Sequence, residues 1–167
     1  MSTTKAAGIG KSLRDNKKIS FDVSVQTPIA NKPFDPIASE CAIIEAFSTW
    51  CGPCIRLIPV LMKHALHYKN IPILQISPEE PEKLKKFFGG VKVPNSVSAI
   101  PRELWDSFSD WFSIQGIPHL VVLHKGVAVF SGHPMDPELE PLLKKLNAQL
   151  EAEKKEKETT ATIETAE

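Results

Sequence analysis

The stretch AFSTWCGPCIRLIPVL, residues 46–61, places two of the three cysteines of this chain only two residues apart. Gly52 and Pro53 separate Cys51 from Cys54. Two cysteines this close can supply half of a metal site, form a small structural disulfide, or alternate between dithiol and disulfide as part of a reaction. The residues around the pair decide between these three uses.

The chain around the pair changes from a strand pattern to a helix pattern. CAIIEAF, residues 41–47, is a short apolar run and predicts a strand that is buried on both faces. A helical pattern follows from Cys54 to about Tyr68, with Pro59 as a kink. Cys51 is therefore expected at the junction between a buried strand and the first turn of a helix.

The rest of the chain continues to alternate between strand and helix patterns. This alternation predicts an α/β fold in which a mixed central sheet is flanked by helices. The further elements we expect are a half-buried strand over residues 18–26, a buried strand over 71–77, a helix over 78–90, a loop or weak strand over 91–100, a helix from Pro101, a hairpin over 119–132 and a closing helix over 136–150.

Composition divides the chain into three parts. Residues 1–18 are basic, with Asp15 as their only acidic residue, and we expect them to extend from a folded domain over residues 19–150. Residues 151–167 form a Glu/Lys-rich tail with almost no large apolar side chain, so we expect this segment to be solvated or frayed.

Overall composition limits the classes of function. The 167 residues include 20 basic and 20 acidic side chains, so no net charge attracts nucleic acid or an anionic membrane. No apolar run reaches the length of a membrane span, and three cysteines are too few for a secreted disulfide framework. The first residues lack the apolar core of a secretory signal. We expect a cytoplasmic, reducing location; the Ser/Thr-rich basic start also suggests a mitochondrial one.

The residue types argue against metal and favour redox chemistry. A structural zinc site needs four ligands, and a second C-x-x-C pair is absent, so we expect no metal. Cys41 is expected to be a small buried side chain of the sheet. The unpaired N–H groups and the dipole of a helix N-terminus stabilise a thiolate at Cys51. Cys51 should therefore be the attacking sulfur, and Cys54, one turn further, the resolving sulfur.

Residues at a distance from the pair favour the same interpretation. Glu45 is the only charged residue in the apolar run 42–47, and on a buried strand it would point at the base of the cysteine site. A buried carboxylate has a raised pKa and can exchange a proton with Cys54. The alternative is that Glu45 lies at an exposed edge of the sheet. Ile117-Pro118 precedes a predicted strand, where a cis-proline is often retained, and Trp50 can shield one flank of the site.

Together these residues resemble the thioredoxin superfamily over roughly residues 19–150. TWCGPC resembles the active-site motif, Pro59 the proline that kinks the following helix, and GIPHLVVLHKG the cis-proline loop with its hairpin. The resemblance implies a thioredoxin-like fold and a protein disulfide reductase that needs no cofactor. It implies catalytic roles for Cys51, Cys54 and Glu45. The residues it implies for contact with substrate are Trp50, Gly52, Pro53, Ile117 and Pro118. The implied partners are a protein disulfide substrate and a reductant such as thioredoxin reductase or a glutathione-like system.

The sequence also departs from plain thioredoxins. About forty residues separate Ser77 from Pro118, which indicates an insertion before the cis-proline strand and resembles the TlpA-like redoxins. Gln75 stands where thioredoxins tend to have a lysine near the buried acid. His119, directly after the proline, is expected to be a plain strand residue; the alternatives are that it adjusts the thiolate or contacts substrate.

A different class of function fits the ends of the chain. A thioredoxin-like domain can be a fixed subunit of a larger assembly, such as a cytoskeletal, microtubule-associated or organellar complex. The basic residues 1–18 and the aromatic helix of the insertion would then contact a partner. Release of the protein from a sedimenting assembly when residues 1–18 are deleted, with reductase activity unchanged, would favour this alternative.

Overall fold

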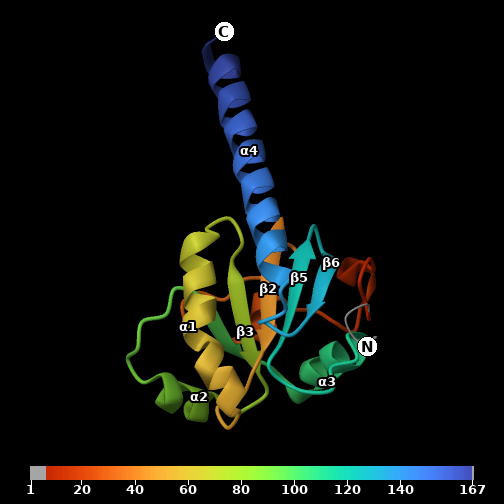
Figure 1. The fold of residues 1–167 in the computed structure, drawn as a ribbon, viewed down its shortest axis with the longest axis vertical. Helices are drawn as coiled ribbons and strands as arrows, with labels where there is room; N and C mark the ends of the chain where they lie inside the picture. Colours follow the sequence, from red (N-terminus) through yellow and green to blue (C-terminus); the bar gives the residue numbers. More distant parts are fainter. Residues whose placement is uncertain (1–6, 167) are drawn as a thin grey trace.

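A six-stranded mixed sheet forms the centre of the molecule. The computed structural model describes residues 7–166, and of the N-terminal extension expected from the sequence, residues 1–6 lie outside this range. The strand order is β1-β4-β3-β2-β5-β6 (Figure 1). The strands are β1 (Thr27–Ala30), β2 (Cys41–Ala46), β3 (Ile73–Ser77), β4 (Ser96–Ala99), β5 (His119–His124) and β6 (Val127–Gly132). The helices are α1 (Gly52–His67), α2 (Pro81–Phe88), α3 (Arg102–Trp111) and α4 (Leu139–Ala166).

Strand β2 lies near the centre of the sheet, as the apolar run 41–47 predicted. It pairs in parallel with β3 and antiparallel with β5, and all six of its residues are buried. A strand with neighbours on both sides and helices over both faces has no solvated side, which explains its nearly continuous apolar sequence. Its carboxyl end leads directly into the cysteine loop and α1.

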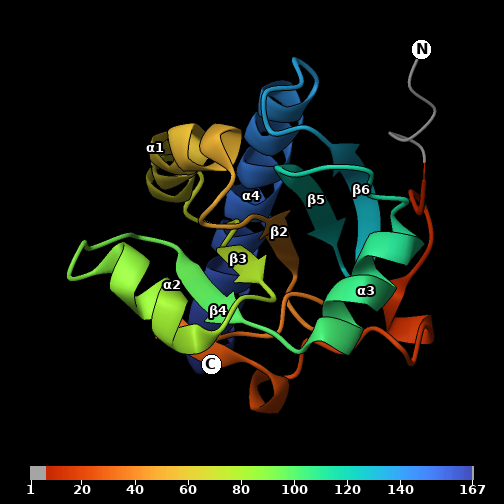
Figure 2. The same cartoon turned by 90° about the horizontal axis from the view of Figure 1, so that it is seen from below.

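Each face of the sheet is covered by different helices. One face carries Ile44 and Leu74, which pack with Phe108 and Phe112 around α3. The other face carries Ile43, which packs with leucines of α1 and α4. Figure 2 shows α1 and α4 on one side of the sheet and α3 on the other. Alternate residues of β2 therefore point toward α1 or toward α3.

The prediction of a half-buried strand over residues 18–26 was wrong. The structure has a short 3-10 helix at Val23–Val25, and the strand follows it, at β1. The Asp22 carboxylate accepts a hydrogen bond from the Ser24 N–H and caps this turn, so local side-chain capping outweighs the alternating pattern. Val23 and Val25 are exposed as a result.

The segment between Ser77 and Pro118, where the sequence predicted an insertion, contains α2, β4 and α3. Strand β4 pairs in parallel with β3 and antiparallel with β1, so the segment expected to be a loop or weak strand is an interior strand of the sheet. Strand β1, which contains Pro28, occupies the edge, where a missing N–H donor is tolerated. Pairing with β3 decided the structure of β4.

Helix α4 continues well past the leucines that pack it against the sheet. Leu143, Leu146 and Leu150 are buried, whereas the described side chains after Leu150 are largely exposed. Figure 1 shows the later turns extending away from the body of the protein. The sequence predicted a solvated or frayed segment; the segment is solvated but helical. Glu and Lys recur three and four residues apart there, as in Glu153 and Lys157, a spacing that stabilises an exposed helix.

Residues before Ile19 pack on the domain. The Gly10 N–H donates to the Ala128 carbonyl at 2.9 Å and the Leu13 N–H to the Gly126 carbonyl at 2.8 Å, so this segment covers the outer edge of β6. Leu13 is only 1% exposed and belongs to the core on the α3 side. Lys11 lies over the Trp111 ring, 5.0 Å from its centroid, so these parts of the basic extension and the aromatic helix contact each other.

The described part of the chain contains no candidate membrane-spanning helix. Across residues 7–166, no helix combines the length and the apolar character that a membrane span requires.

Candidate active site

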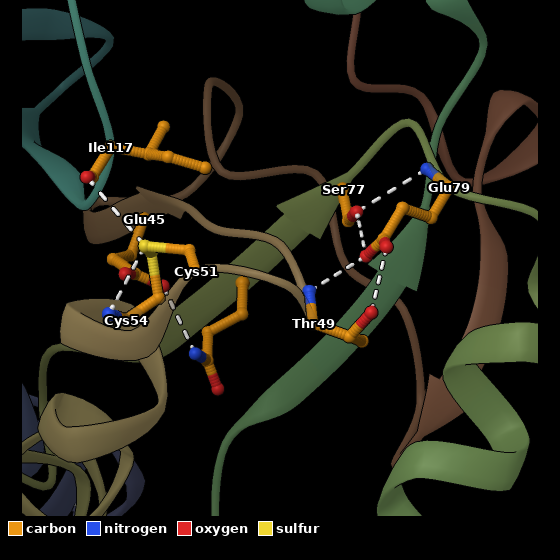
Figure 3. Close-up of a disulfide and its surroundings, with 8 residues drawn as sticks. Glu45, Thr49, Cys51, Cys54, Ser77, Glu79 and Ile117 are labelled. Atoms are coloured by element: carbon orange, nitrogen blue, oxygen red, sulfur yellow. Dashed lines mark hydrogen bonds between the residues drawn. A yellow bond between two sulfur atoms is a disulfide. The ribbon is translucent and has the colours of Figure 1, made fainter.

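The two cysteines lie at the start of α1 and are joined by a disulfide (Figure 3). Cys51 is the N-cap residue, with φ −90° and ψ 104°, and Gly52 and Pro53 begin the helix. The Cys54 N–H donates to the Cys51 Sγ at 3.2 Å. In the reduced protein the same N–H and the helix dipole would stabilise a thiolate at Cys51, because both place positive charge next to the sulfur.

Glu45 is fully buried on the face of β2 that α1 covers. Its neighbours on that face are Ile43, which packs against Leu61 of α1, and Phe47, which packs with both cysteines. The exposed fraction of Glu45 is 0%, and β2 has a strand on either side, so the alternative position at a sheet edge is excluded. Figure 3 shows Glu45 together with the disulfide.

Burial raises the pKa of the Glu45 carboxyl to about 8, although a hydrogen bond from Gln75 acts in the opposite direction. The Gln75 Nε2 donates to Glu45 Oε2 at 3.0 Å, and the Asn95 Nδ2 donates to Gln75 Oε1 at 2.6 Å. Glu45 Oε1 has no protein hydrogen-bond partner among the described residues. The carboxyl is thus held by one oxygen and has the other available for a proton near neutral pH.

The loop before β5 contacts the cysteine pair as well. The Ile117–Pro118 peptide bond is cis, and the Ile117 carbonyl oxygen lies 3.7 Å from the Cys51 Sγ. Pro118 is buried, while Ile117 is partly buried and packs among the residues around the disulfide. Of the other residues expected to contact substrate, Gly52 and Pro53 are exposed and Trp50 is 72% exposed. The buried sulfurs are thus framed by an accessible surface.

Two titratable residues near the site in sequence take no part in this arrangement. His119 pairs in register with Ala46, on the α3 side of the sheet, and its Nε2 lies 2.8 Å from the Ser131 Oγ. Burial, with a smaller contribution from His133, lowers the pKa of His119 to about 4. Burial raises the pKa of the Cys41 thiol to about 12, which agrees with its expected role as an inert core residue.

The sequence did not reveal Asn95 or Glu79 as neighbours of the site. Asn95 was assigned to a loop or weak strand, and Glu79 to the start of a helix. Glu79 follows β3, the parallel neighbour of β2, and its carboxylate binds Thr49 in the cysteine loop. The available signal was positional, since the carboxyl ends of neighbouring parallel strands meet at one edge of a sheet.

This fold and this disulfide at a helix N-terminus define a thioredoxin-like protein. The thioredoxin family model matches residues 25–95. The chain is 30% identical over 70 residues to the thioredoxin of Chlamydia pneumoniae, covering 41% of this chain and 69% of that protein. It is 32% identical over 63 residues to the thioredoxin of Chlamydia muridarum, covering 38% of this chain and 62% of that relative's length. The chain belongs to the thioredoxin family.

Solved structures agree with the fold. A protein from Bacteroides thetaiotaomicron assigned as a protein disulfide isomerase superposes with a TM-score of 0.66 at 20% identity, covering 90% of this chain and 95% of that one. A thioredoxin-like protein from Aeropyrum pernix gives a TM-score of 0.59 at 18% identity, covering 80% and 92% of the two chains. At these identities the similarity supports the thioredoxin-like fold alone.

Proposed function

We propose that this chain is a thiol–disulfide oxidoreductase that reduces protein disulfides with its Cys-Gly-Pro-Cys couple. The observation that carries the proposal is the position of Cys51 as N-cap of α1, with Glu45 buried on the sheet face that α1 covers. A helix N-terminus favours the thiolate needed for attack, and a buried carboxyl supplies the proton transfer needed for resolution. The thioredoxins that the chain matches support the same class of reaction.

In the first step, the Cys51 thiolate of the reduced protein attacks one sulfur of a substrate disulfide. A bond forms between Cys51 and that sulfur, the substrate S–S bond breaks, and the second substrate sulfur leaves as a thiolate that takes a proton from water. The Cys54 N–H that donates to the Cys51 Sγ holds the attacking atom in place.

In the second step, Cys54 resolves the mixed disulfide. Its thiol gives its proton to the Glu45 carboxylate, and the resulting thiolate attacks Cys51. The bond from Cys51 to the substrate breaks, and the first substrate sulfur leaves as a thiolate that takes up, directly or through water, the proton that Glu45 received. Two electrons have then passed to the substrate, and the protein holds the Cys51–Cys54 disulfide seen in the structure. A reductant, such as a thioredoxin reductase or a glutathione-like system, must return both electrons.

The substrate segment is proposed to lie over the surface that frames the sulfurs. Trp50, Gly52 and Pro53 border it on the α1 side, and Ile117 and Pro118 on the β5 side. An exposed tryptophan offers apolar contact area to many sequences. Exchange between sulfur atoms transfers the electrons directly, so the proposed reaction requires no bound cofactor.

Insulin reduction tests the proposal. Replacing Cys51 with Ser is expected to abolish the acceleration that the protein gives to dithiothreitol-driven precipitation of insulin chains, because a hydroxyl cannot form the mixed disulfide. Cys41→Ala is the matched control: it removes a cysteine whose buried thiol is inert, so the rate should stay within about twofold of wild type. A wild-type protein that leaves insulin oxidised, or a Cys51→Ser variant that retains turnover, would contradict the proposal.

A further inference from the structure

A second carboxylate, that of Glu79, lies at the edge of the cysteine loop. Glu79 is in the connection between β3 and α2, and only 10% of its side chain is exposed. Its Oε2 accepts a hydrogen bond from the Thr49 N–H at 2.9 Å, and its Oε1 accepts one from the Thr49 hydroxyl at 2.7 Å. Both carboxylate oxygens of Glu79 thus accept hydrogen bonds from Thr49, one from its backbone and one from its side chain (Figure 3).

Two further partners bind the Glu79 carboxylate, so each of its oxygens has two partners. The Ser77 hydroxyl donates to Oε2 at 3.1 Å, and the Lys83 Nζ lies 3.1 Å from Oε1. Desolvation raises the pKa of Glu79, but the donors from Thr49, Lys83 and Ser77 together outweigh it and leave the pKa below its usual value. The carboxylate therefore stays charged while the cysteines react.

The position of Thr49 makes this contact relevant to the cysteines. Thr49 is followed by Trp50 and Cys51, and the Cys51 N–H donates to the Ser48 carbonyl at 3.3 Å. The start of the loop that carries the nucleophile is thus bound to the connection that follows β3, the neighbouring strand of the sheet. Because β2 and β3 run in parallel, their carboxyl ends lie together and bring the two segments within reach.

We propose that Glu79 is a positioning residue for the cysteine loop. By binding both donors of Thr49, it fixes the backbone conformation that leads into Cys51. This conformation determines where the Cys51 sulfur lies at the helix N-terminus and where the exposed Trp50 lies. This inference rests on the proposed function, because it describes the same cysteine in its reactive state. Preorganisation of this kind matters for rate, since small displacements of a reacting atom are costly.

Two simpler roles for Glu79 make different predictions. If Glu79 served stability alone, its loss would lower the melting temperature and leave the reactivity of Cys51 in the folded protein unchanged. If it acted only through its negative charge, its loss would favour the Cys51 thiolate, speed alkylation and be sensitive to salt. Positioning predicts slower alkylation, because the sulfur loses its alignment with the helix N-terminus.

The experiment compares Glu79→Gln with Glu82→Gln in the reduced protein. Glu82 lies nearby in α2 but is exposed and pairs with Lys85, so its variant controls for charge removal. Iodoacetamide labelling of Cys51, followed by mass spectrometry from pH 5 to 9 under conditions where both variants are folded, gives the rate and the pKa of the thiolate. Glu79→Gln should slow labelling at neutral pH by about tenfold and raise the apparent pKa, while Glu82→Gln stays within about twofold of wild type.

A second pair of variants isolates the side-chain contact. Thr49→Val removes the hydroxyl that donates to Glu79 and should slow labelling by about threefold, whereas Thr49→Ser retains the hydroxyl and should restore the wild-type rate. In the Glu79→Gln background, Thr49→Val should slow labelling by less than it does in the wild type, because the glutamine amide retains only one of the two acceptor oxygens that bind Thr49. This pair also tests the inference if Glu79→Gln fails to fold.

The outcomes separate this inference from the proposed function. Labelling of Cys51 needs no substrate, so it reports on Glu79 even if the wild type fails to reduce insulin, a result that counts against the proposed function alone. Equal labelling rates for wild type and Glu79→Gln, faster labelling of the variant, or full additivity with Thr49→Val would each overturn the positioning role.

Discussion

Two glutamates, Glu45 and Glu79, flank the cysteine loop and have opposite properties. Glu45 lies on β2, is fully buried and receives one hydrogen bond, from Gln75. Glu79 follows the neighbouring strand β3, is also largely buried, and receives donors from Thr49, Ser77 and Lys83. The pKa of Glu45 is raised to about 8, and the pKa of Glu79 is lowered.

The difference shows that donors as well as burial decide what a carboxyl group can do. Desolvation raises the pKa of both groups, but at Glu79 the donors outweigh it and at Glu45 a single amide does not. Glu79 therefore keeps its charge and acts as an anchor. Glu45 is close to giving and taking a proton at neutral pH, which suits the proposed exchange with Cys54.

The largest expected effect is on the pH dependence of stability. The Glu45 carboxyl has a pKa of about 8 in the folded protein and the usual 4.5 when unfolded, so between these values the folded state holds a proton that the unfolded state releases. Its contribution is fully present below pH 4.5 and is lost as pH rises to about 8. The free energy of unfolding of Glu45→Gln relative to wild type should therefore rise over this range, by on the order of 5 kcal/mol.

Urea unfolding of the oxidised protein from pH 4.5 to 8.5 measures this difference. Glu79→Gln is the control, because the pKa of Glu79 is shifted in the opposite direction. A carboxyl whose pKa is lowered by folding stabilises the folded protein above its unfolded-state pKa, and this stabilisation is lost only when the pH falls below that value. Its difference from wild type should stay constant across the window. If the difference in free energy of unfolding between Glu45→Gln and wild type were also constant over this pH range, the raised pKa of Glu45 would be contradicted.

The next effect is on the resolving step. Glu45→Gln should slow the attack of Cys54 on a preformed mixed disulfide at Cys51 by about a hundredfold, because the thiol loses its base. Stopped-flow release of a chromogenic thiol from that mixed disulfide reports the rate. Iodoacetamide labelling of Cys51, the reaction expected to depend on Glu79, should change less than about threefold in the same variant. Equal slowing of both reactions would remove the distinction between the two glutamates.

The smallest effect concerns the amide that tunes Glu45. Gln75→Leu removes the donor to Glu45 Oε2, so the pKa of Glu45 should rise by about one further unit. Asn95→Ala, which frees Gln75 Oε1, should produce a smaller rise. Carbon-13 NMR of labelled glutamate side chains follows this titration directly. Ser98→Ala, which removes a buried side chain of β4 whose partner is Gln26, should leave the Glu45 titration unchanged. A fall in the Glu45 pKa in Gln75→Leu would reverse the role given to the amide.

Much of the cysteine site was predictable from local sequence. The start of α1 at the cysteines, the buried strand before them and the turn at Lys125-Gly126 follow from short-range patterns that match the structure. The charged residue within an otherwise apolar run led us to expect Glu45 at the base of the site, with an exposed sheet edge as the alternative, and the structure shows that Glu45 is buried. These features depend on periodicity and on the chemistry of neighbouring residues, which a single sequence contains.

Other features were not predicted, either because local capping competed with the pattern or because contacts between distant segments decided the structure. Local capping by Asp22 outweighed the alternating pattern that predicted a strand over residues 18–26, and pairing with β3 made the segment around Val97 an interior strand. The bonds from Thr49 to Glu79 and from Asn95 to Gln75 join residues 30 and 20 positions apart.

The sequence established that this chain carries a redox-capable cysteine pair at a strand–helix junction, because helix starts, buried strands and cysteine spacing are local signals. Only the tertiary structure decided which of the two glutamates at the cysteine loop has a raised pKa and which a lowered one. That choice depends on the number of donors that the fold brings to each carboxyl, and two of them, Thr49 for Glu79 and Gln75 for Glu45, lie 30 residues away and reach the carboxyl only when the sheet is assembled.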